Sequence, residues 1–158
     1  YIFVTGGVVS SVGKGITVAV SSLTISAKQK KEAKALLKGT GETLFIDDES
    51  LLDAVTAISG SGPAYVFLLI ETLARSGVKA GLDEGMAMNL ARQTVIGSAA
   101  LAEAGPDISA ETLRKNVTSP GGTTEAALKV LMSGEWQDIY DRAIEAATRR
   151  GRELSGLS

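Results

Sequence analysis

The chain has 158 residues, of which 44% are hydrophobic and 22% charged, and its formal net charge of −2 gives no reason to expect nucleic acid or an anionic membrane as a partner. It contains no cysteine and no histidine, which excludes thiol and Ser-His-Asp catalysis and leaves no thiolate or imidazole metal ligands. We therefore expect no metal site, and chemistry that depends on hydroxyls, carboxylates, lysines, backbone amides or a bound cofactor.

The first element predicted is a short strand over residues 1–4, followed by a glycine turn at residues 5–7. A variant phosphate loop could follow, formed by Gly6, Gly7, Gly13 and Lys14. A strict P-loop has four residues between its glycine and Gly-Lys, whereas five separate Gly7 from Gly13 here. Lys14 is equally well explained as a solvated lysine in a turn.

The first sixteen residues, YIFVTGGVVSSVGKGI, resemble the amino terminus of CTP synthase. That family carries a nucleotide-binding loop of this variant spacing after its first strand. The resemblance raises the hypothesis of a chimeric chain joined at about residues 12–16.

Strands are next predicted over residues 16–21 and 42–46, with a helix between them that Ser26 caps and that ends near Lys38. Ala33, Leu36 and Leu37 are expected to form its buried stripe. A second capping box is expected from Ser50 to Asp53. The first fifty residues thus form a small β/α appendage, and residues 51–158 a helical domain.

Two helices in the second part, over residues 63–74 and 85–101, carry one charge each and are apolar almost all round. Such helices must be buried on nearly every side, so we expect a partner chain to cover them. A monomeric bundle with two central helices is the alternative. Residues 54–70 are interrupted by Ser-Gly-Ser-Gly-Pro, and we expect no membrane span there.

Ser109 is predicted to cap a short helix that ends near residue 117. The sequence Thr-Ser-Pro-Gly-Gly-Thr-Thr at residues 118–124 then favours a helix start with Pro120 at the first helical position and Thr118 or Ser119 as the cap. Glycines there allow an anion to approach free backbone amides. An ordinary capped helix start explains the same residues.

Two longer motifs, DAVTAISGSGPAYVF at residues 53–67 and NVTSPGGTTEAAL at residues 116–128, resemble the carboxy-terminal domain of pyrroline-5-carboxylate reductase. The resemblance extends over about residues 12–158. It implies a mainly α fold, an interlocking helical dimerisation domain with a small β/α appendage at the amino terminus. It also implies a cytoplasmic homodimer or higher homo-oligomer that reduces 1-pyrroline-5-carboxylate to proline with NADPH or NADH.

The same resemblance implies roles for individual residues. Thr124 would be the catalytic residue, its hydroxyl touching the ring nitrogen, and the backbone amides around Gly122 would hold the substrate carboxylate. The substrate-binding residues implied are Asn116, Ser119, Gly121, Gly122 and Thr123, with Ser59, Gly60 and Ser61 in an opposing wall.

The GxGxxG fingerprint of dinucleotide-binding domains does not occur in these 158 residues. We therefore expect the chain to contribute the dimer and substrate half of a reductase, to bind no nicotinamide cofactor by itself and to have little activity alone. The alternatives are a CTP synthase-like nucleotide-binding fragment and an oligomerisation module without a ligand.

Overall fold

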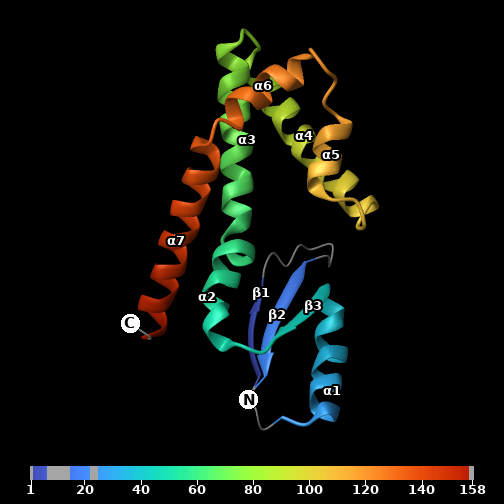
Figure 1. Ribbon diagram of the computed structural model, residues 1–158, viewed down its shortest axis with the longest axis vertical. Coiled ribbons are helices and arrows are strands. Elements are labelled where there is room, and N and C mark those ends of the chain that lie inside the picture. Colours follow the sequence, from blue (N-terminus) through green and yellow to red (C-terminus); the bar gives the residue numbers. More distant parts are fainter. Residues whose placement is uncertain (1, 7–14, 22–24, 157–158) are drawn as a thin grey trace. The chain divides into compact units, whose positions relative to one another are not determined.

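The computed structural model describes residues 2–6, 15–21 and 25–156 (Figure 1). Its Cα positions divide into two compact units, which are described separately. The first contains the chain up to Ala64 together with the segment from Asp141 onward, and the second is Tyr65–Tyr140. The predicted mainly helical fold with a small β/α part is confirmed.

The described part of the first unit contains a three-stranded sheet in the order β1-β2-β3 (Figure 1). The strands are β1 (Ile2–Gly6), β2 (Ile16–Ser21) and β3 (Glu42–Ile46). β2 pairs antiparallel with β1 and parallel with β3. Val18, Ala19 and Val20 on this central strand are buried, as expected for an apolar run with neighbours on both edges. Of the candidate phosphate loop, Gly6 ends β1, whereas Gly7, Gly13 and Lys14 lie outside the described residues.

Helix α1 (Ala27–Leu37) begins at the predicted cap. The Ser26 hydroxyl accepts a hydrogen bond from the Gln29 amide, and the Gln29 side chain accepts one from the Ser26 amide, which completes a capping box. Lys30 lies over the Phe45 ring of β3, 5.2 Å from its centroid. The predicted buried stripe is wrong at Leu36, which is 81% exposed. A short 3-10 helix, η1 (Lys38–Thr40), leads into β3.

The capping box predicted from Ser50 to Asp53 is also wrong. The cap is Asp48, whose carboxylate accepts a hydrogen bond from the Ser50 amide at 2.9 Å and starts η2 (Glu49–Leu51). Hydrogen bonds from the Ser50 side chain and amide lower the pKa of Asp48. The chain continues through α2 (Leu52–Val55) and the π-helix η3 (Thr56–Gly60) without a break.

Four long or medium helices and one short helix complete the chain (Figure 1). They are α3 (Gly62–Lys79), α4 (Glu84–Ala104), α5 (Ala110–Asn116), α6 (Thr123–Leu131) and α7 (Glu135–Ser155). Small residues bring α3 and α4 together, since a Cβ at Gly77 would lie 3.2 Å from the Ala87 Cβ. Ala74, Ala87 and Ala91 are buried there.

The larger apolar side chains of α3 and α4 point outward. Phe67 is 62% exposed and Ile96 is 58% exposed. The apolar composition of these helices requires that they be covered, and the chain alone does not cover them. By length and composition alone, the helical run Glu49–Lys79 could also cross a membrane, which the sequence did not lead us to expect. One such helix is weak evidence, because the core helix of a soluble protein has the same properties.

Gly41 should be essential to the turn before β3. Its φ is 125°, and a Cβ there would collide with the Gly15 backbone, whose carbonyl accepts a hydrogen bond from Glu42. We expect Gly41→Ala to lower the free energy of opening of the β2 amides by about 2 kcal/mol or more, measured by hydrogen exchange. Gly39→Ala is the control, because its Cβ would meet nothing within 4 Å. Equal exchange rates in the two variants would contradict the prediction.

Candidate functional site

The candidate site is the loop between α5 and α6 in the second unit. Helix α5 begins as predicted, because the Ser109 hydroxyl accepts a hydrogen bond from the Thr112 amide at 3.1 Å. At its other end the Thr118 hydroxyl donates to the Arg114 carbonyl at 2.6 Å. The Thr118 amide donates to the Lys115 carbonyl at 3.0 Å. These bonds satisfy carbonyls that the helix end would otherwise leave free.

The predicted helix start at Pro120 is wrong, and so are the side-chain caps at Thr118 and Ser119. Helix α6 starts at Thr123, its N-cap is Gly122, and no side chain caps it. Pro120 instead lies in a turn that the Gly122 amide closes by donating to the Ser119 carbonyl at 3.0 Å. Gly121 has a φ of 71°. Proline followed by a glycine of positive φ is the signature of a type II turn.

The turn leaves three backbone donors free at the start of α6, the amides of Thr123, Thr124 and Glu125. Within the described ranges, no hydrogen-bond partner is found for the amides or the hydroxyls of Thr123 and Thr124, and both residues are exposed. Free amides at a helix start, together with the positive end of the helix dipole, favour a carboxylate or phosphate. The Gly121 amide is not free, because it donates to Glu125 Oε2 at 2.8 Å.

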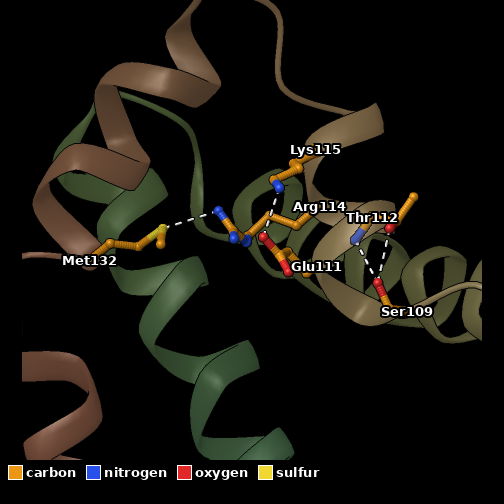
Figure 2. Close-up of polar contacts among 6 residues, drawn as sticks. All are labelled: Ser109, Glu111, Thr112, Arg114, Lys115 and Met132. Carbon is orange, nitrogen blue, oxygen red and sulfur yellow. Dashed lines mark hydrogen bonds and ion pairs between the residues drawn. The ribbon is translucent and has the colours of Figure 1, made fainter.

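Polar contacts of α5 lie on both sides of the helix's own boundary, one to the end of α6 and one within α5 (Figure 2). Arg114 Nη1 lies 3.1 Å from Met132 Sδ, which ties α5 to the residue that follows α6. An ion pair of 2.7 Å joins Lys115 to Glu111 along the exposed side of α5. The Arg114 contact could not be predicted, because Arg114 and Met132 are 18 residues apart in the chain.

The structure brings most of the predicted substrate residues together on this loop. They are Asn116 at the end of α5, Ser119, Gly121 and Gly122 in the turn, and Thr123 and Thr124 in the first turn of α6. Ser59, Gly60 and Ser61 belong to the first unit, at the π-helix, where the Ser59 hydroxyl donates to the Val55 carbonyl at 2.9 Å.

A separate cavity of about 420 Å³ lies between α3 and α4. It is lined by apolar and charged side chains of both helices, namely Glu71, Ala74, Arg75, Val78, Lys79, Glu84 and Met88. None of the predicted site residues lines this cavity. The exposed loop, rather than a closed pocket of this chain, is therefore the candidate site.

The family profile described as pyrroline-5-carboxylate reductase dimerisation matches residues 49–154. The chain belongs to this family. Pyrroline-5-carboxylate reductase from Pseudomonas aeruginosa is 44% identical over 131 residues, which is 83% of this chain and 48% of that protein. The Synechocystis enzyme of the same name is 42% identical over 92% of this chain and 54% of its own length. The chain spans about half the length of these curated relatives.

Solved structures of pyrroline-5-carboxylate reductases are similar to the whole fold. The structure from Coxiella burnetii has a TM-score of 0.88 at 37% identity, and the matched region covers 97% of this chain and 56% of the Coxiella chain. The structure from Plasmodium falciparum, described with NADP bound, has a TM-score of 0.78 at 33% identity. The matched region covers 97% of this chain and 58% of the Plasmodium chain. Because this similarity includes the β/α appendage, a chimeric origin from CTP synthase receives no support.

In this reductase-family domain, Gly121 should tolerate a side chain poorly because of its backbone conformation. Its φ of 71° disfavours any residue with a Cβ, although no atom lies within 4 Å of the Cβ position. We expect Gly121→Ala to destabilise the loop by about 1 kcal/mol. Amide exchange at residues 118–124 should become faster, and Gly121→Asn should be milder, because asparagine tolerates this conformation. Equal exchange in all three proteins would contradict this account of the turn.

Proposed function

We propose that this chain is the dimerisation and substrate-site half of a pyrroline-5-carboxylate reductase, which reduces 1-pyrroline-5-carboxylate to proline with NADPH or NADH. The observation that carries the proposal is the family match over residues 49–154, which includes the glycine loop before α6. The division into an appendage, residues 1–50, and a helical domain, residues 51–158, is part of this proposal.

The loop provides the chemistry that such a substrate needs from a protein. The free amides of Thr123 and Thr124 would hold the carboxylate, and the Thr124 hydroxyl would lie at the ring nitrogen. Asn116 and Ser119 would shape the loop, and residues 59–61 would belong to an opposing wall. Reduction of a protonated C=N bond requires no metal, thiol or histidine of the protein, which agrees with the composition.

The described residues that follow β3 do not fit the phosphates of a nicotinamide cofactor. The parallel strand β3 ends at Ile46 and is followed by Asp47, which is ion-paired with Lys30 at 3.5 Å, and by Asp48, whose carboxylate would repel a pyrophosphate. Asp48 is already used as a helix cap. No glycine-rich fingerprint occurs in the sequence. We therefore assign the binding of the hydride-donating cofactor to no residue of this chain.

The proposed assembly is a homodimer in which α3 and α4 of two copies cover one another. Their exposed apolar side chains are the reason, because the folded chain alone leaves Phe67 and Ile96 largely in contact with water. A cytoplasmic location, without nucleic acid or a membrane as partner, belongs to the same proposal. An oligomerisation module without a ligand remains the second candidate, because the exposed helices favour assembly whether or not the loop binds substrate.

The substrate proposal is tested first by adding NADPH and pyrroline-5-carboxylate to the purified chain, and then by titrating proline in a calorimeter. We expect no NADPH oxidation but saturable proline binding, weakened about tenfold or more in Thr124→Ala through loss of one hydrogen bond to a charged group. Thr124→Ser, which keeps the hydroxyl, is the control and should bind nearly normally. Turnover by the chain alone would refute the statement that it binds no nicotinamide cofactor by itself. Absence of proline binding would favour the oligomerisation module.

The dimer proposal is tested by analytical ultracentrifugation at micromolar concentration. We expect a dimer, and a dissociation constant about tenfold or more higher in Phe67→Lys, because a charge replaces an apolar side chain in the covered surface. Leu36→Lys is the matched control, since Leu36 is equally apolar and 81% exposed but lies on α1. A monomeric unaltered chain would count against the dimer.

A further inference from the structure

We propose that Glu125 is a positioning residue, whose carboxylate holds the Pro-Gly-Gly turn in the conformation that presents the Thr123 and Thr124 amides. The inference rests on the proposed function, because it gives Glu125 a part in binding the substrate carboxylate. Glu125 itself would not touch the substrate.

The carboxylate closes the turn from the helix side. Glu125 Oε2 accepts a hydrogen bond from the Gly121 amide at 2.8 Å, and the Gly122 amide donates to the Ser119 carbonyl at 3.0 Å. Glu125 is the third residue after the N-cap Gly122, the position from which a capping-box glutamate reaches back. Here the Glu125 carboxylate reaches the amide of Gly121, one residue before the N-cap, because the Gly122 amide already donates to Ser119 within the turn.

This bond selects which amides remain available. With the Gly121 and Gly122 donors both engaged, the amides of Thr123 and Thr124 are the first free donors at the start of α6, followed by that of Glu125. The bond also restrains Gly121 at its φ of 71°, a conformation that a free glycine readily leaves. Binding to a fixed loop avoids the cost of ordering it, so the restraint should increase the affinity for a carboxylate.

The charge of Glu125 works in the opposite direction, since a carboxylate near the site repels an anionic ligand. Lys129 Nζ lies 3.8 Å from Glu125 Oε2, one helical turn away, and offsets part of this charge. Restraint and repulsion can therefore be separated experimentally. Glutamine keeps an oxygen that can accept the Gly121 hydrogen bond but has no charge, whereas alanine removes both.

The experiment compares proline titrations and Gly121 amide exchange in the unaltered chain, Glu125→Ala and Glu125→Gln. We expect Glu125→Ala to accelerate Gly121 exchange and to weaken proline binding about tenfold, because the loop loses the charge-assisted hydrogen bond that restrains it. Glu125→Gln should restore slow exchange and bind proline at least as well as the unaltered chain. Glu111→Ala, which removes a similar surface ion pair with Lys115, is the control and should change neither quantity.

Two results would overturn the inference while leaving the proposed function intact. One is unchanged proline affinity in Glu125→Ala. The other is tighter binding in both Glu125 variants, which would assign to Glu125 a repulsive charge and no positioning role. Absence of proline binding by the unaltered chain would instead overturn the proposed function and this inference together. A circular dichroism spectrum with unaltered helix content in each variant ensures that the comparison concerns folded protein.

Discussion

The size of the buried side chains is the constraint on which the helical part of this structure depends. Within the described residues the buried hydrophobic side chains are only alanine and valine, and no large side chain is fully buried. Alanine and glycine let α3 and α4 approach closely, as at Gly77 and Ala87, but they leave little apolar area between the helices. The larger side chains therefore lie on the outer faces, where they need a covering surface that the proposed second copy would supply.

The substrate proposal likewise depends on backbone rather than on side-chain acids and bases. The turn at residues 119–122 uses two of its own amides and leaves the next three free. A chain without histidine or cysteine can bind a carboxylate in this way, because peptide N–H groups at a helix start are already oriented donors. Pro120, Gly121 and Gly122 form the turn, and the Glu125 carboxylate accepts a hydrogen bond from it, so these residues set the conformation of the loop.

Local signals in the sequence predicted much of this fold. Ser26 and Ser109 cap helices as expected, and the strands at residues 16–21 and 42–46 have the predicted bounds. The start of α6 was misplaced because proline fits both the first helical position and the second position of a turn. That error concealed Glu125, whose capping position is recognisable only once Gly122 is the N-cap. The exposure of Leu36 could not be predicted, because a periodic apolar stripe does not specify what covers it.

The π-helix at Thr56–Gly60 accommodates one extra residue in the helical segment that carries Ser59. A π turn accommodates one residue more than an α turn, and one residue corresponds to about 100° of rotation around a helix axis. Deleting one residue there would restore an ordinary α-helix and leave the following side chains close to their present faces, whereas deleting one residue from an α-helix turns them by about 100°. The π-helix should therefore tolerate the loss of one residue better than the α-helices on either side of it.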